Sequence, residues 1–333
     1  MTSTYDFAIF GGNALAGLVA GLLAHDHNKQ VLLIADPISP QRLPRSVDLA
    51  FSLATRPHSW KMLRRGVGET LALMTSLGAP RSIEPVAVRV ATDLPATQAA
   101  LAHIAATARG YGQSSRGDVF PWVPRLSGPV SLAGSRVVTV DRDAARLDVG
   151  RASGAQLLIS GERADIGQIV IADDADLLDL VPADQRPLPL ALRSMTATLT
   201  APTRRLPTPI MIFPDRSVAL QQRADLSILA LAGGDSDVEA RLASTLPGPF
   251  PLPRLATTHF RRVVASDGAP MIGRVKPSKL MVLAGLGDAA AFFAPIVARF
   301  LAGVPADDEK QWIATLSPSR PRDAIADFVA GVA

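Results

Sequence analysis

The sequence contains no cysteine, only five histidines, and an aromatic content of 5%. Without cysteine the chain has no disulfides, no thiolate nucleophile, no thiolate metal site and no thioether link to a cofactor. His25 and His27 form the only close histidine pair, which we expect at a solvated helix end, so no metal site is predicted. The scarcity of aromatic residues also argues against an aromatic cage as a binding pocket.

Charged residues and long apolar runs are scarce as well. Charged residues make up 19% of the chain and the formal net charge is +4, with no block of like charge, so we expect no nucleic-acid partner. No apolar run is long enough to span a bilayer, and the first ten residues lack the features of a signal peptide. The sequence therefore predicts no membrane span and a cytoplasmic location.

Hydrophobic residues make up 48% of the 333 positions, enough for two domains with substantial cores. Residues 5–10 and 30–36 read as buried strands and 14–24 as a helix between them, which is a β-α-β unit. The next predicted elements are a helix at 58–78, a strand at 85–92, and a helix within 93–112 that has Asp93 as N-cap and Gly110 as its stop. They are followed by mainly strands from 134 to 232, a helix at 237–246, and a final strand-loop-strand-helix.

The stretch "FGGNALAGLVAG" (10–21) stands where a dinucleotide-binding turn is expected. Such a turn needs small residues for the sharp bend, for the approach of pyrophosphate to backbone N–H groups, and for helix packing. The register Gly12, Ala14, Gly17 keeps both outer glycines and is preferred over Gly11, Asn13, Ala16, although the Asn13 amide is a possible phosphate donor. Asp36 ends the second strand, where a carboxylate can accept hydrogen bonds from the ribose hydroxyls.

The C-terminal stretch "DGAPMIG" (267–273) is followed by a strand, the pair Gly285 and Gly287, and a helix that begins near Pro295. In order and spacing it resembles the glycine oxidase, sarcosine oxidase and D-amino-acid oxidase superfamily of FAD-dependent oxidoreductases. The resemblance is loose over most of the chain and specific in the last fifth. It implies an α/β fold: a Rossmann-like FAD-binding domain of the D-amino-acid oxidase type (1–80, 130–185 and 255–333) with a β-rich substrate domain (81–129 and 186–254).

The same resemblance implies site residues. Pro295 suits the first turn of a helix whose N-terminus would stabilise the negative charge of reduced flavin. Arg262 corresponds to an arginine that in several members lies over the substrate carboxylate. Its alternatives are pairing with Asp267 or with an acid at the domain interface. His259 on the same strand is an acid–base candidate. Trp122 and Phe213 are pocket candidates for which core packing is preferred. The further implied FAD contacts are Arg45, Val138, Ala172, Gly285, Gly287, Asp288 and Ala289.

One position departs from the family pattern, which expects Ala-x-Gly where this chain has Ala172, Asp173 and Asp174. Two adjacent carboxylates would repel a pyrophosphate unless they point to solvent or to an arginine. Three functions therefore stay open. The first is FAD-dependent oxidation of a small amine or amino acid, which requires no protein nucleophile. The second is a degenerate flavoprotein-like subunit that assists assembly or regulation of a partner protein. The third is an FAD monooxygenase, since "GDAA" (287–290) and "RSVDLAFSL" (45–53) resemble aromatic-ring hydroxylases.

Overall fold

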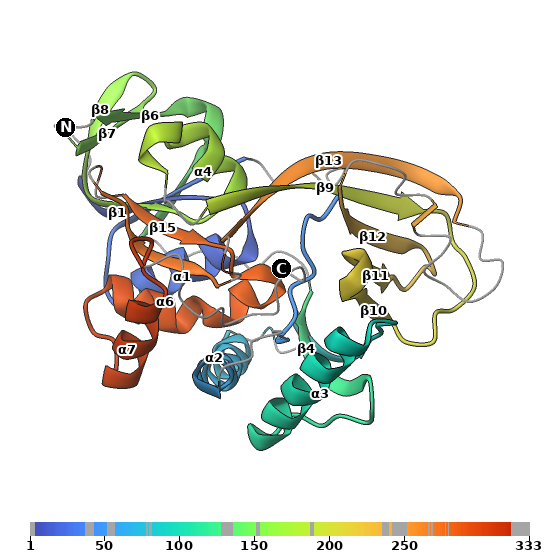
Figure 1. The fold of residues 1–333 in the computed structure, drawn as a ribbon. Helices are drawn as coiled ribbons and strands as arrows, with labels where there is room; N and C mark the ends of the chain where they lie inside the picture. The colour runs from blue at the N-terminus through green and yellow to red at the C-terminus, as the bar shows by residue number, and fades with distance from the viewer. Residues whose placement is uncertain are drawn as a thin grey trace.

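The structure, a computed structural model, contains two β-sheets with helices packed around them (Figure 1). It describes residues 4–36, 43–51, 57–77, 79, 82–127, 136–150, 154–186, 190–234, 240–241, 252–265, 267, 269–276, 278 and 280–320. The predicted class, a parallel α/β sheet with a second β-rich sheet, is confirmed. All but two residues of the predicted helix at 237–246 lie outside these ranges. No helix within them combines the length and apolar character needed to cross a membrane.

The first sheet is built from both ends of the chain, in the order β14-β15-β8-β1-β2-β5. Its strands are β1 (Thr4–Phe10), β2 (Val31–Ala35), β5 (Val137–Asp141), β8 (Glu162–Ile171), β14 (Met271–Arg274) and β15 (Met281–Ala284). All neighbours pair in parallel except β14 with β15, and β6 (Ala145–Gly150) and β7 (Gly154–Ile159) extend β8 as an antiparallel ribbon. The carboxyl ends of β1, β2 and β8 therefore meet at one edge.

Alternate residues of β1 face two different cores, as expected for a strand buried on both sides. Phe7 and Ile9 belong to the core that includes α1 (Ala14–His25) and α6 (Ala294–Leu301). Ala8 and Phe10 belong to the core that includes β6, β7 and α4 (Asp174–Leu180). Helix α1 is almost entirely buried, because its alanines, glycines and leucines let it pack closely on the sheet.

The second sheet has the order β13-β9-β12-β11-β10-β3-β4. Its strands are β3 (Ile83–Val90), β4 (Val119–Leu126), β9 (Leu190–Thr200), β10 (Ile210–Phe213), β11 (Val218–Gln222), β12 (Ile228–Gly233) and β13 (Arg254–Ala265). Figure 1 shows β9 and β13 as long strands that run from the first sheet into the second. The predicted domain limits assign most of β13 to the first domain although it pairs with β9, and these limits stay a prediction.

Two local features of the second sheet differ from the sequence expectation. Strand β4 was not predicted because it contains Pro121 and Pro124, which an edge strand tolerates. Asp93 is not an N-cap, since α3 (Pro95–Gly110) begins after Leu94. Instead the carboxylate of Asp215, from the neighbouring 3₁₀ turn, accepts the backbone N–H groups of Asp93 (3.2 Å) and Leu94 (3.4 Å).

Helix α2 (Pro57–Ser76) crosses the 3₁₀ segment η5 (Gly287–Phe293) at very close range. A Cβ atom added at Gly66 would lie 1.9 Å from the carbonyl oxygen of Phe292, so only glycine fits at this crossing. Since η5 leads directly into α6, this contact fixes the position of α2 against these two elements.

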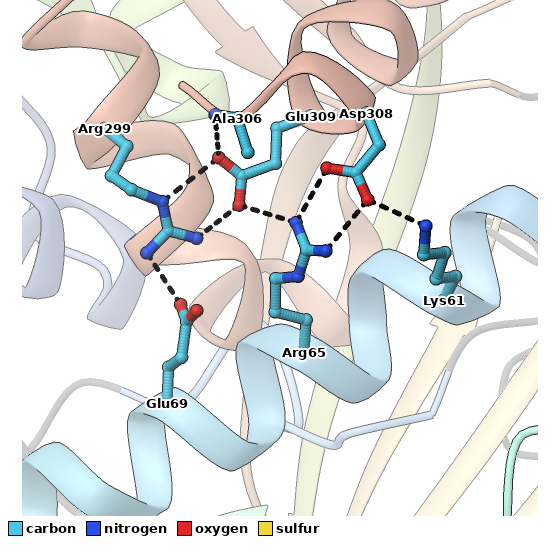
Figure 2. Close-up of polar contacts among 7 residues, drawn as sticks. All are labelled: Lys61, Arg65, Glu69, Arg299, Ala306, Asp308 and Glu309. Carbon is cyan, nitrogen blue, oxygen red and sulfur yellow. Dashed lines mark hydrogen bonds and ion pairs between the residues drawn. The ribbon is translucent and has the colours of Figure 1, made fainter. Parts of the chain in front are cut away.

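Figure 2 shows a charged network that joins α2, α6 and α7 (Asp307–Thr315), which we call the clamp. Arg65 donates to both carboxylate oxygens of Asp308 (2.9 and 2.8 Å), and Arg299 Nε donates to Glu309 (3.0 Å). Glu309 is 1% exposed; burial alone would raise its pKa, but hydrogen bonds from Arg299 and from backbone hold that pKa below its usual range. Glu69 and Lys61 complete the clamp by pairing with Arg299 and Asp308.

A second buried ion pair holds the "DGAP" motif. Arg320 Nε and Nη2 donate to the two carboxylate oxygens of Asp267 (2.6 and 2.7 Å), and the same guanidinium donates to the carbonyls of Ala269 and Pro270. The partner of Asp267 is therefore Arg320, and the alternative pairing of Arg262 with Asp267 is wrong.

Candidate functional site

The turn after β1 has the sharp geometry of a dinucleotide-binding turn. Gly11 adopts φ +150°, and a Cβ there would lie 3.0 Å from the Cβ of Ala16 and 3.3 Å from the carbonyl carbon of Ala172. Helix α1 begins at Ala14, with Asn13 as its N-cap. Gly11, Asn13 and Ala16 thus take the three positions of the fingerprint, and the preferred register that starts at Gly12 is wrong.

The side chain of Asn13 is bonded on both sides. Its Oδ1 accepts the backbone N–H of Ala16 (2.9 Å), and its Nδ2 donates to the carbonyl of Ala172 (2.6 Å). The expectation that this amide donates to a phosphate is therefore not met in this conformation. The phosphate donors that α1 offers are backbone N–H groups, because those of Ala14 and Leu15 bind no acceptor among the described residues.

The other residues predicted for the nucleotide lie around this turn. Gly12 is exposed, and a Cβ there would meet only Ala35, at 3.9 Å, so open space lies in front of it. Asp36 is exposed directly after β2. Val138, on the neighbouring strand β5, is 42% exposed. Gly17 lies inside α1, one turn from its start.

A cavity of about 120 Å³ opens beside the turn, between the carboxyl edge of the first sheet and strand β13 of the second sheet. It is lined by Asn13, Leu15, Arg45, Ser46, Asp48, Ala172, Asp173, Asp174, Ala175, Phe260, Arg261, Arg262, Val263, Val264, Leu283, Ala284, Gly285, Leu286, Gly287 and Ala290. The fold thus brings together six of the predicted site residues: Asn13, Arg45, Ala172, Arg262, Gly285 and Gly287.

Several other predicted residues lie outside the cavity. His259 is exposed on β13, and its Nδ1 lies 3.1 Å from Thr196 Oγ1. Ala289 and Pro295 are buried in the packing of η5 and α6. Phe213 is in the core of the second sheet, as preferred from the sequence. Trp122 is 68% exposed on β4, so its expected core packing is wrong.

The two carboxylates at the end of β8 are both bonded to backbone N–H groups. Asp173 Oδ1 accepts the N–H of Ala175 (2.8 Å) and caps α4, while Asp174 Oδ2 accepts the N–H of Val263 on β13 (3.0 Å). Burial raises the pKa of Asp174 to about 6, against the opposing effects of the Val263 N–H and the charge of Arg262. Asp174 therefore ties the end of β8 to β13, and the charge of Arg262 acts on its carboxyl.

Arg262 reaches the cavity from β13 and is held there by the segment that precedes α2. Its Nη2 donates to the carbonyl of Arg45 (2.8 Å), and the guanidinium of Arg45 lies 5.6 Å from the ring centroid of Phe260. The positive charge of Arg262 lowers the pKa of both Asp174 and Asp288, although burial dominates for each carboxyl.

Asp48 and Asp288 complete what we call the pocket cluster, with Asp174, Arg45 and Arg262. The N–H groups of Leu49 and Val47 donate to the carbonyl (2.8 Å) and carboxylate (3.3 Å) of Asp288. Burial and the charge of Asp288 raise the pKa of Asp48 to about 7, and burial also raises the pKa of Asp288. Asp48 was not predicted, and its only signal was its place in "RSVDLAFSL".

In sequence, no family model and no curated protein matches this chain. Solved structures do match in fold. Glycine oxidase from Geobacillus kaustophilus superposes with a TM-score of 0.70 at 16% identity, covering 96% of this chain and 100% of that one. L-proline dehydrogenase from P. horikoshii superposes with a TM-score of 0.73 at 14% identity, covering 96% and 98%. NikD, an amino acid oxidase of nikkomycin biosynthesis, gives 0.64 at 16% identity, covering 90% and 94%.

The chain has the fold of the D-amino-acid oxidase and glycine oxidase superfamily. The fold that the resemblance in the sequence implied is thereby confirmed. The donor set at the turn after β1 would fit a dinucleotide: N–H groups at the α1 N-terminus, open space at Gly12, and carboxylates at 173–174 that are already bonded. Across the described residues, no cluster of His, Asp and Glu side chains is placed to hold a metal ion.

Proposed function

We propose that the protein is an FAD-dependent oxidoreductase that oxidises a small amine or amino acid. The observation that carries this proposal is the shared cavity. Asn13 and Leu15 of the dinucleotide turn line the same space as Arg262 of β13, so a bound dinucleotide and a small charged substrate would meet there. When bound, FAD supplies the hydride acceptor, and the protein need only bind and orient the substrate.

The residues of the chain divide into two groups in this proposal. The N–H groups of Ala14 and Leu15 would hold the pyrophosphate, and the Asp36 carboxylate would accept hydrogen bonds from the ribose hydroxyls. On the substrate side, Arg262 orients an anionic group of the substrate through its guanidinium.

Asp48 is suited to hold the proton that the substrate amine must lose before oxidation. Its carboxyl lines the cavity and has a pKa of about 7, raised by burial and by Asp288. A carboxyl with such a pKa can accept a proton near neutral pH and return it to solvent. A histidine is not required for this step, which agrees with the position of His259 outside the cavity.

The test is to purify the protein and record its visible spectrum before and after anaerobic addition of single amines and amino acids. We expect flavin absorption that bleaches with at least one of them and returns with an electron acceptor. A colourless protein whose melting temperature does not rise on addition of FAD would contradict the proposal.

A second candidate is the degenerate subunit that serves a partner protein. It is favoured by one observation: side chains stand at both positions where the family pattern has a close-approach glycine, Asn13 and Asp174. The same experiment separates the candidates, since only the subunit would stay colourless. Bleaching by NADH or NADPH alone would instead support the monooxygenase.

A further inference from the structure

We propose that Asn13 is a bridge that assembles the dinucleotide cradle in the absence of cofactor, and that the cradle as a result binds FAD more weakly than it would with glycine at this position. The cofactor part of this inference rests on the proposed function. The structural part does not, because it concerns the folded chain alone.

The side chain of Asn13 bonds to a residue that is itself bonded to β1. The carbonyl of Ala172 accepts Asn13 Nδ2 at 2.6 Å, while the N–H of Ala172 donates to the carbonyl of Phe10 at 2.8 Å. Ala172 is thus bonded on one side to the last residue of β1 and on the other to the N-cap of α1. The bridge joins the ends of two neighbouring strands through the turn itself, and it needs no bound ligand to do so.

A glycine at position 13 could form neither of these side-chain bonds. With glycine at position 13 the carbonyl of Ala172 and the N–H of Ala16 would both lose their present partner. The cap bond alone matters little in such a replacement, because glycine is itself a tolerated N-cap. The bond to Ala172 has no such substitute, so its loss should be visible in the stability of the protein without cofactor.

The side chain of Asn13 also affects how closely a cofactor can approach the turn. The second fingerprint position is where backbone must approach the pyrophosphate closely, which is why glycine suits it. Here Asn13 adds a side chain at that position and occupies the N–H of Ala16, one of the orphan donors at the start of α1. The side chain is neutral, so it takes space and one donor without repelling phosphate.

The experiment compares the full-length protein with Asn13→Gly, each stripped of cofactor. We expect the melting temperature of the stripped variant to fall by about 1.5 °C, from the loss of one partly buried bond in a chain of this size. We expect its dissociation constant for FAD, measured by quenching of flavin fluorescence, to fall at least threefold. Asn28→Gly is the matched control, because Asn28 is exposed at φ +57°, a conformation that glycine adopts freely, and both quantities should stay unchanged.

Asn13→Ser separates the cap from the bridge and serves if the glycine variant does not fold. Serine can still accept the N–H of Ala16 but is too short to bond Ala172, so the melting temperature should fall nearly as far as for glycine. Unchanged melting temperatures in both variants would overturn the bridge, and equal or weaker FAD binding by the glycine variant would overturn the effect on affinity. If neither the parent protein nor the variants bind FAD, the proposed function fails together with the affinity effect, while the melting temperatures still decide the bridge.

Discussion

The clamp and the pocket cluster contain similar numbers of charged side chains, but the pKa values of their carboxyls are shifted in opposite directions. In the clamp, the carboxylates of Asp308 and Glu309 each receive charged hydrogen bonds from side chains of other helices (Figure 2). In the pocket cluster, the carboxyl of Asp174 bonds to a backbone N–H, and the charge of Asp288 acts on Asp48. The pKa of Asp308 and of Glu309 is accordingly lowered, whereas the pKa of Asp48 and of Asp174 is raised.

The direction of each pKa shift shows which carboxylates stabilise the fold when ionised and which destabilise it. A carboxyl whose pKa is lowered is more stable ionised in the folded protein, and one whose pKa is raised destabilises the fold when it ionises. Raised values at a cavity are typical of functional groups, while lowered values between helices are typical of structural pairs. The two clusters should therefore respond with opposite signs to neutral substitutions and to pH.

The largest effect is expected from Arg299→Met, which removes one of the two arginines that bind Glu309. Glu309 would stay buried with Arg65 as its remaining cation (3.1 Å). Breaking a buried pair on one side costs about 3 kcal/mol, so the free energy of unfolding in urea should fall by about that amount at pH 7.

Arg274→Met is the matched control for this loss. Arg274 is exposed on β14 and forms no ion pair with any described residue, so its replacement should change the free energy of unfolding by less than about 0.5 kcal/mol. A similar loss from both variants would mean that the clamp contributes nothing beyond the packing of an arginine side chain.

Asp48→Asn should act in the opposite direction and stabilise the protein without cofactor. The pKa of Asp48 is raised to about 7, so the parent protein loses stability as pH rises from about 4, the unfolded value, to about 7. The Asp48→Asn variant cannot ionise at this position, so it keeps its stability as pH rises. We expect a gain of about 2 kcal/mol at pH 8, about half of the full shift because the side chain keeps some contact with the cavity, and under about 0.5 kcal/mol at pH 4.

Urea unfolding of both proteins at the two pH values measures this gain. A variant that is less stable than its parent at pH 8 would show that Asp48 is stabilising when ionised, and the contrast between the clusters would fail. Under the proposed function the same variant should lose most of its substrate oxidation.

The smallest effect is expected from Asp308→Asn, which mirrors Asp48→Asn. Hydrogen bonds from Arg65 and Lys61 hold the pKa of Asp308 well below its usual range, so the stabilisation is present above about pH 4 and is lost as pH falls below it. The variant should be about 1 kcal/mol less stable than the parent at pH 7 and should approach it at pH 3, as measured by urea unfolding. A difference that stays constant over this range would point to lost packing instead of lost charge.

Much of the fold could be predicted from the sequence because local signals and tertiary packing agree. The apolar runs of β1 and β2 and the small residues of α1 predicted a β-α-β unit close to its observed limits. Strand β4 was missed because its prolines oppose a strand locally, and only its edge position admits them. Helix α4 was missed because Asp173 was interpreted through a family pattern, although aspartate is a strong N-cap signal.

The site was predicted less well because its residues come from segments distant in sequence. The glycines located the turn, but the register depends on where α1 starts, which Asn13 decides as its N-cap. Arg262 was found through a resemblance. Asp48 could not be found from local pattern, because its surroundings are created by Asp288, which is 240 residues further along the chain.

The strand order of the first sheet has a consequence for the time course of synthesis. Strand β8 pairs with β1 on one edge and with β15 on the other, and more than 100 residues separate β8 from β15. While the ribosome makes those residues, one edge of β8 and the cavity side of α1 lack their final neighbours. An open edge of this kind is a template for wrong pairing. This edge of β8 therefore stays open to wrong pairing until β15 has been made.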